Sequence, residues 1–265
     1  MGIANDADAV NNAIKEPAPE LSSPEKVIVE LQRGLVDPNT GIWYTDAEVR
    51  EMTGADEEYM AGLESKSTLT YAEYMSSLIK RTVVRVGQMS TSDNPSVLDA
   101  LTIGDRDILF LGVIRATYGR TKSFQAQCGN CEKLNDVTVD LEEDFPLLEP
   151  NVDLRSTLDV KIRNGETIKL RIPTAADNAF AAKVSKSVAE QNSAMLAKCR
   201  VWENGETQAQ ADSWAKGLNL GDRNTLIKSL TSIKAGPKLG EVDVPCAHCG
   251  HDMTIRIDWI SLLLS

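Results

Sequence analysis

The fold of this chain is decided by two stretches, Cys128-Gly129-Asn130-Cys131 and Cys246-Ala247-His248-Cys249, which lie far apart in the sequence. A C-x-x-C pair on a tight turn presents two thiolates about one tetrahedral edge apart, so two such pairs complete a four-sulfur shell. A closed shell of this kind is typical of structural rather than catalytic zinc. The sequence therefore predicts one structural zinc ion, with the metal ligands Cys128, Cys131, Cys246 and Cys249.

The residues around the two pairs also correspond. Val139-Asp140-Leu141 stands at the same distance after the first pair as Ile257-Asp258-Trp259 stands after the second. Residues 124–127 and 242–245 precede the pairs and have extended character, so each half is predicted as strand, knuckle and strand. Two such hairpins around one ion form a zinc ribbon, which a long insertion splits here.

Other uses of the cysteines fit less well. A redox C-x-x-C pair normally follows a strand and opens a helix, and a disulfide within such a pair closes too small a loop to stabilise much. We also find no signal-peptide pattern, which favours a reducing compartment. Cys199 stands alone in a helical stretch and is expected to be a small buried residue. His251 is a better substitute ligand than His248, although both are expected to be solvated.

Composition limits the partners. The chain has 265 residues, 42% of them hydrophobic, and a formal net charge of −11. This charge opposes nucleic-acid binding, because affinity for the phosphate backbone comes mainly from Lys and Arg. The apolar tail 259–264 is far shorter than the roughly 20 residues that cross a bilayer. We therefore expect a soluble protein with neither nucleic-acid nor membrane partners.

The predicted fold class is α+β, a split zinc ribbon with an inserted helical subdomain and an N-terminal α/β segment. Strands are expected near 27–35 and 82–86, and helices near 71–79 and 106–118, the latter ending at Gly119. The predicted segments are an arm (1–26), a strand and helix region (27–100), a core helix with the first knuckle (101–150), the insertion (151–238), and the second knuckle with a C-terminal strand (239–265).

The insertion has clear local signals of its own. Asn164-Gly165 between alternating runs predicts a hairpin, and Thr174 ahead of Asp177 predicts a helix start. Gly236-Pro237 is expected to end the insertion. Further helices are predicted over 189–201, 207–217 and 222–233, the last with Asp222 as its N-cap.

Catalytic motifs are missing from the sequence. It contains no phosphate-binding G-x-x-x-x-G-K-S/T loop, no G-x-S-x-G elbow and no H-E-x-x-H. Both histidines lie in the second knuckle, so the usual general base is unavailable elsewhere. The sequence therefore predicts a structural or assembly protein rather than an enzyme.

The order of these features resembles the T-even-type phage baseplate proteins of the central hub, from Val27 to the end of the chain. The resemblance rests on an ordered set that includes both C-x-x-C pairs, the Gly-Pro break, and the segments Val49-Arg50-Glu51-Met52-Thr53-Gly54, Gly104-Asp105-Arg106-Asp107, Arg115-Ala116-Thr117-Tyr118-Gly119 and Gly221-Asp222-Arg223-Asn224-Thr225-Leu226.

The resemblance implies a component or assembly factor of a phage tail baseplate. Its partners would be other tail and hub proteins, with the tape-measure protein one candidate, and its location the host cytoplasm during assembly and the virion tail baseplate if retained. Two alternatives stay open: a non-virion assembly chaperone that binds the tape-measure protein, and a zinc-ribbon nucleic-acid-binding protein.

Overall fold

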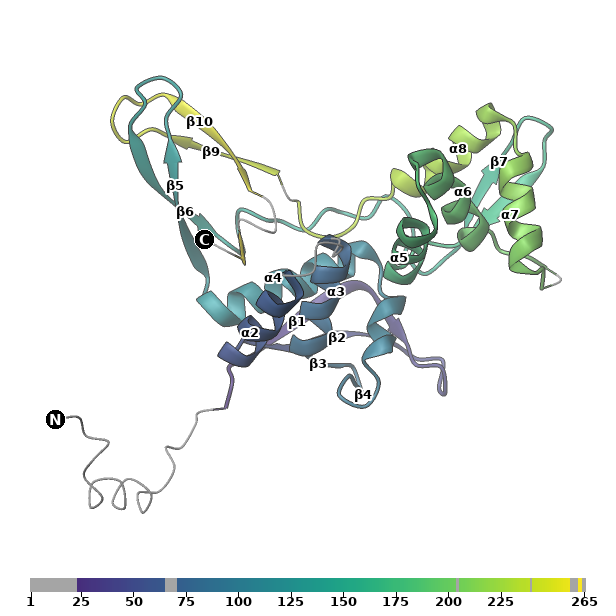
Figure 1. Ribbon diagram of the computed structural model, residues 1–265, viewed down its shortest axis with the longest axis horizontal. Coiled ribbons are helices and arrows are strands. Elements are labelled where there is room, and N and C mark those ends of the chain that lie inside the picture. The colour runs from purple at the N-terminus through teal and green to yellow at the C-terminus, as the bar shows by residue number, and fades with distance from the viewer. Residues whose placement is uncertain (1–22, 65–70, 204, 239, 258–261, 264–265) are drawn as a thin grey trace, which may run out of the picture.

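The computed structural model describes residues 23–64, 71–203, 205–238, 240–257 and 262–263 (Figure 1). It is a mixed helix and strand protein, which confirms the predicted α+β class. The described helices lie in two groups, one against the N-terminal sheet and one in the insertion, and two hairpins project from the first group (Figure 1). Within the described residues, no helix has the length and apolar character needed to span a membrane. The predicted arm lies almost wholly outside these residues, as do Asp258 and Trp259.

The N-terminal part is a four-stranded antiparallel sheet covered by helices. The strand order is β1-β2-β3-β4, and β1 pairs with β2 from Lys26 opposite Arg50 to Val36 opposite Trp43, with a register shift between. Its elements are β1 (Lys26–Val36), β2 (Trp43–Arg50), α2 (Gly54–Glu64), α3 (Tyr71–Thr82), β3 (Val83–Val86), β4 (Met89–Ser90), the 3-10 helix η2 (Pro95–Ala100) and α4 (Ile103–Tyr118).

Helix α4 lies against the sheet and forms the centre of this part. Its residues Ile108, Leu109 and Val113 are buried with side chains of β1 and β2. Gly112 permits the close approach, because a Cβ atom there would lie 2.6 Å from Cγ1 of Val29. The helix starts three residues earlier than the periodicity predicts, since the Thr102 hydroxyl accepts the N–H of Asp105 and caps it. Gly119 ends it as predicted.

Asp105 fixes the start of α4 to β1. Its carboxylate is fully buried and accepts the backbone N–H groups of Gln32, Arg33 and Gly34 at 2.8, 3.1 and 3.1 Å. These donors lie in the irregular part of β1, where the pairing register with β2 shifts. A single carboxylate thus satisfies backbone groups that the sheet leaves unpaired.

The insertion has a hydrophobic core of its own, built from the β7–β8 hairpin and helices. Gly165 sits in the predicted turn with φ of +89°, and Thr174 and Asp177 form the predicted capping box. The elements are β7 (Leu158–Lys161), β8 (Thr167–Leu170), α5 (Ala175–Val184), α6 (Val188–Cys199), α7 (Gln208–Gly217) and α8 (Leu220–Thr231).

The prediction of Asp222 as the N-cap of α8 is wrong. The cap is Asn219, whose side chain accepts the N–H of Asp222 at 2.9 Å. Asp222 therefore stands inside the first turn, where its carboxylate accepts the backbone N–H of Arg163 in the β7–β8 turn at 3.0 Å. Aspartate is favoured both at the N-cap and in the first turn, where its charge interacts with the helix dipole. The residue type alone therefore did not show which of these two positions Asp222 occupies.

The chain returns from the insertion past the start of α4. Gly236 has φ of +84°, and a Cβ atom on it would lie 2.7 Å from the Cα atom of Gly104. The N–H of Gly236 donates to the side-chain oxygen of Gln32 at 2.6 Å, and Pro237 forms an isolated bridge with Leu147. The predicted Gly-Pro break is thus the point where the insertion rejoins the N-terminal part.

Candidate metal centre

Each C-x-x-C pair sits at the turn of a two-stranded antiparallel hairpin. The first hairpin consists of β5 (Thr121–Gln127) and β6 (Leu134–Asp140), and the second of β9 (Gly240–Pro245) and β10 (Asp252–Ile257). The two hairpins lie side by side and project away from α4 (Figure 1). After β10, Leu262 and Leu263 are helical, so the predicted C-terminal strand ends before them.

The two turns have the same backbone hydrogen bonds. Cys128 donates its N–H to the carbonyl of Lys133 at 2.9 Å, and Cys246 donates to that of His251 at 2.8 Å. Four residues after each of these cysteines, an N–H returns to the cysteine carbonyl at 2.9 Å, from Glu132 in the first turn and from Gly250 in the second. Both returning residues have positive φ, 58° and 70°. Glu132 adopts a left-handed backbone conformation that is less costly for glycine than for other residues. The hydrogen bonds of the turn therefore outweigh this conformational cost.

The four cysteine sulfurs converge to one point. All lie within 4.8 Å of one another, with 3.8 Å between Cys128 and Cys249 and 3.7 Å between Cys131 and Cys246. A tetrahedral zinc site with Zn–S bonds of about 2.3 Å has S···S edges of about 3.8 Å. These two pairs thus have the tetrahedral spacing, and each joins one hairpin to the other. None of the cysteines is in a disulfide.

Backbone and side-chain donors surround these sulfurs. The N–H groups of Asn130 and His248 donate to Cys128 and Cys246, each at 3.4 Å. Burial opposes ionisation of Cys246, but the hydrogen bonds, led by the N–H of His248, outweigh it and lower the pKa of this thiol to about 6. Donors of this kind favour the thiolate, which is the form that binds a metal.

The pKa of Cys131 moves in the opposite direction. The Lys133 N–H lowers it, but burial and the neighbouring cysteines outweigh this and raise the pKa to about 11. Four negative sulfurs at these distances repel one another. A divalent cation would supply the compensating charge and deprotonate the remaining thiols.

Neither histidine belongs to the four-sulfur group. His248 and His251 are exposed, and His248 Nε2 lies 3.2 Å from the carbonyl oxygen of Leu134. His251 contributes its backbone carbonyl to the turn rather than its ring to the cluster. Among the described residues, the four cysteines are the group with the side-chain geometry of a metal site.

The remaining cysteine is buried elsewhere, as predicted. Cys199 ends α6 in the core of the insertion and is fully buried. Burial raises the pKa of this thiol to about 12, so it stays protonated and unreactive near neutral pH.

Residues outside the two C-x-x-C pairs also hold the hairpins, and sequence reasoning missed them. Asn135 is buried in β6 and accepts the N–H of Ala247 at 2.9 Å, which links the two hairpins. Lys122 is buried in β5; its ammonium lies 3.9 Å from the ring centre of Tyr118 and donates to the carbonyl of Leu262. A buried lysine in a strand has no local sequence signal that distinguishes it from an exposed one.

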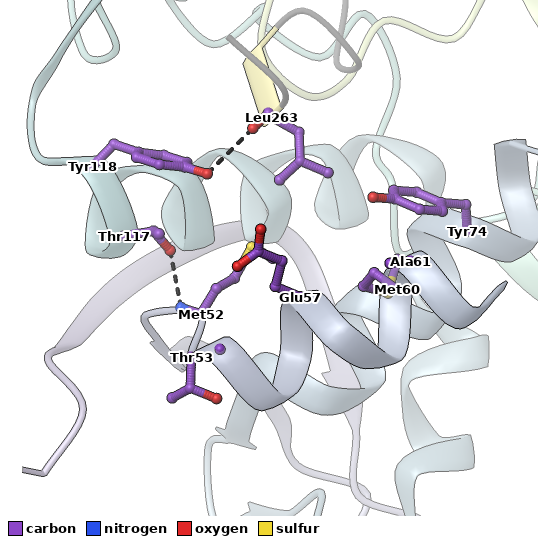
Figure 2. A pocket seen from close by; sticks show the side chains of 10 residues that line it. Met52, Thr53, Glu57, Met60, Ala61, Tyr74, Thr117, Tyr118 and Leu263 are labelled. Carbon is purple, nitrogen blue, oxygen red and sulfur yellow. Dashed lines mark hydrogen bonds between the residues drawn. The ribbon is translucent and has the colours of Figure 1, made fainter. Parts of the chain in front are cut away.

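A pocket of about 460 Å³ lies beside this linkage, between α2, α4 and the C-terminal residues (Figure 2). The hydroxyl of Tyr118 donates to the carbonyl of Leu263 at 3.2 Å on one side. On the other side, the N–H of Met52 donates to the Thr117 hydroxyl at 3.0 Å. Its walls combine methionine, tyrosine, leucine and alanine side chains with two threonines, Thr53 and Thr117, and one carboxylate, Glu57.

Residues 39–263 match the family model described as T4 bacteriophage base plate protein. The chain belongs to this family. The match covers most of the chain and confirms the resemblance that the ordered motifs predicted. Searches of curated proteins and of solved structures gave no match.

Membership of this baseplate family has direct consequences. It supports a structural role in a phage tail, a location in the virion tail, and interaction with other tail proteins. Baseplate proteins of this kind are generally not enzymes.

Proposed function

We propose that this protein is a structural or assembly component of the baseplate hub, and that it docks other tail proteins on a scaffold stabilised by zinc. The observation that carries the proposal is the convergence of Cys128, Cys131, Cys246 and Cys249 with tetrahedral spacing, in a chain of a baseplate family. The turns of the two hairpins have the same hydrogen bonds. Each turn supplies two of the four cysteines, so neither hairpin can complete the site alone.

Zinc would act mechanically in this protein. An isolated two-stranded hairpin is marginally stable in water, and the two hairpins here share one hydrophobic cluster that includes Cys128 and Cys246 at the turns and residues of α4. Structural zinc sites in peptides contribute about 10–16 kcal/mol of apparent binding free energy. An ion held by both turns would therefore fix their positions and, with them, the path of the chain into and out of the insertion.

The acidic segment 46–73 offers a smaller docking surface than its composition indicates. Asp56 is fully buried, and Asp46 and Glu48 form ion pairs with Arg85 at 2.7 and 3.0 Å. Glu57 and Glu58 of α2 are exposed. Together with Glu73 of α3, which is also exposed, they are the described carboxylates of the segment that we expect to attract a basic surface on another tail protein.

The first prediction concerns metal content. Purified protein is expected to carry one zinc ion per chain, because the four sulfurs form one closed shell. Elemental analysis measures the ratio. All five thiols should react slowly with a thiol reagent in native protein, and the four of the cluster should react rapidly after chelation. A zinc content well below one equivalent, or four freely reacting thiols before chelation, would contradict the proposed ligand set.

The second prediction concerns assembly. Phage lacking this protein should accumulate filled capsids without finished tails, because its partners would lack their docking surface. Complementation with wild-type protein should restore tails, whereas the variant with both Cys246→Ser and Cys249→Ser should not. Cys199→Ala is the matched control, since it removes a cysteine outside the cluster and should complement. Normal tails without this protein would contradict the proposal.

Virions from the same phage strains distinguish a hub component from a non-virion chaperone. Mass spectrometry of purified virions should detect this chain at a fixed ratio to other baseplate proteins if it is a hub component. Its absence from complete virions, together with failed assembly when it is deleted, would assign it to the chaperone class instead.

A further inference from the structure

The chain contains the same structural motif twice. Arg50-Glu51-Met52-Thr53-Gly54-Ala55-Asp56 follows the β1–β2 hairpin and opens α2, and Arg171-Ile172-Pro173-Thr174-Ala175-Ala176-Asp177 follows the β7–β8 hairpin and opens α5. In both, an arginine Nη1 contacts Oδ2 of the aspartate at 2.6 Å. The threonine N–H and hydroxyl also donate to the same Oδ2, at 2.9 Å in the first copy and 2.8 Å in the second.

A second shared motif follows in the same order. Thr102-Ile103-Gly104-Asp105-Arg106 opens α4, and Asn219-Leu220-Gly221-Asp222-Arg223 opens α8. In each, the first residue caps the helix by accepting the aspartate N–H. Each aspartate carboxylate also accepts backbone N–H groups of a preceding hairpin. Asp105 accepts those of residues 32–34 in the β1–β2 hairpin, and Asp222 accepts that of Arg163 in the β7–β8 hairpin.

Each of these helices leads on to one of the two C-x-x-C hairpins. The same order of elements therefore occurs over residues 26–140 and again over 158–257. Each begins with a β-hairpin and the Arg–Asp motif, continues with helices of which the last opens with Gly-Asp-Arg, and ends with a cysteine hairpin. The repetition of side-chain contacts as well as elements identifies two copies of one unit, with the four-cysteine cluster formed between them.

The two copies differ at one edge of the hairpin. In the first, α3 passes into β3, which pairs with β2 at Ala47 opposite Val86 and Val49 opposite Val83. Strand β4 then covers the outer edge of β3, with Arg85 opposite Ser90. The first copy thus closes its sheet with its own chain.

In the second copy, α6 passes into residues 200–203, which occupy the place of β3. Their pairing with β8 consists of one bridge, Leu170 opposite Arg200, with the N–H of Val201 donating to the Lys169 carbonyl at 2.8 Å. Among the described residues, this segment has no counterpart of β4. A pocket of about 530 Å³ lies beside this segment and β8, lined by residues 166–169, 200–203 and 206.

The pocket lining contains buried polar atoms without partners. Within the described part of the chain, Nε1 of Trp202 and Oε2 of Glu206 are buried and make no hydrogen bond. Arg200 is held beside them, because its guanidinium lies 3.7 Å from the ring centre of Trp202 and 4.3 Å from that of Trp214. Each unsatisfied buried group costs about 1–3 kcal/mol, so a ligand that offers both an acceptor and a donor is favoured.

We propose that the edge of residues 200–203 beside this pocket docks an extended segment of another tail protein, which pairs with that edge as β4 pairs with β3 in the first copy. A peptide backbone offers a carbonyl for Trp202 Nε1 and an N–H for Glu206 Oε2, and strand addition to an incomplete sheet is a common mode of peptide recognition. The tail protein as partner rests on the proposed function, whereas the incomplete edge rests on the comparison of the two copies.

The test is site-specific photocrosslinking in phage-infected cells. A benzophenone amino acid replaces Val201 in the second copy and, as the matched control, Val84 at the corresponding place in β3 of the first. Unchanged melting temperatures show that both variants fold. The Val201 position should crosslink to one short segment of another tail protein, and the Val84 position only to its own chain.

A synthetic peptide of the crosslinked segment then tests the chemistry. Trp202→Phe keeps an aromatic ring but removes the N–H, and should weaken peptide binding about fivefold, as expected for one lost hydrogen bond. Glu206→Gln should weaken it similarly, and Asp159→Asn, which changes an exposed carboxylate of β7 outside the pocket, should not. Crosslinks from Val201 only to this chain or a second copy of it, or equal affinities for all variants, would overturn the docking site. Normal tails in the deletion phage would instead contradict the proposed function.

Discussion

Cys131→Ser is expected to abolish tight metal binding and to separate the two hairpins. Cys131 stands 3.7 Å from Cys246 of the other hairpin, so its loss removes a ligand that bridges the two halves of the site. Most of the about 10–16 kcal/mol that a structural zinc contributes would be lost. Thermal unfolding and limited proteolysis should show a much lower melting temperature and rapid cleavage in the hairpins and the insertion.

Cys199→Ala is the matched control for this experiment. Cys199 is also buried, but it packs in the core of the insertion with its sulfur 3.6 Å from that of Met195. Its truncation should cost about 1 kcal/mol, as expected for a small cavity. A chelator should destabilise wild-type protein and Cys199→Ala strongly, and Cys131→Ser little. Equal destabilisation by the two substitutions would show that the cluster is not the main stabilising feature.

Asp56→Asn is expected to give the largest loss among substitutions that leave the cysteines intact. The Asp56 side chain is fully buried and pairs with Arg50 at 2.6 Å and Arg81 at 2.8 Å. Removing one partner of a buried ion pair typically costs about 3–5 kcal/mol, because the remaining charges are left uncompensated. Chemical denaturation measures the loss, and Glu58→Gln, an exposed carboxylate of the same helix, should change stability little.

The effect of Asp56→Asn should depend on pH. Burial raises the pKa of Asp56, but hydrogen bonds from Arg50, Thr53 and Arg81 outweigh it and hold the pKa well below its usual range. A depressed pKa stabilises the folded state at pH values above the unfolded value of about 3.9, and this contribution is lost as pH falls toward the folded value. The difference in unfolding free energy between wild type and Asp56→Asn should therefore narrow between pH 7 and pH 3. A constant difference would contradict this role.

Local features were the most predictable part of the fold. The core helix, the Asn164-Gly165 turn and the capping box of Thr174 with Asp177 were predicted, because each depends on residues only a few positions apart. The exception was the cap of α8, which moved from Asp222 to Asn219. Both residue types favour helix starts, and the choice depends on the contact of Asp222 with Arg163 in another element.

In the candidate site, too, features set by neighbouring residues were predicted and contacts between distant segments were not. The C-x-x-C spacing predicted the four cysteines and the shared turns, because a five-residue turn is set by its own hydrogen bonds. It did not predict Lys122 or Asn135, whose functions depend on Leu262 and Ala247 in distant parts of the chain. Nor did it show that Asp56 is buried between two arginines rather than exposed with its acidic neighbours.

The sequence by itself thus determined the fold class, the family, and the pairs of cysteines that can share an ion. Only the tertiary structure decided that all four sulfurs converge, with Cys128 3.8 Å from Cys249 and Cys131 3.7 Å from Cys246. It alone also showed that, among the described residues, the second copy has no strand in the place that β4 takes in the first. The physical reason is that turns and caps are fixed by neighbouring residues, whereas the meeting of distant segments depends on how all the elements pack together.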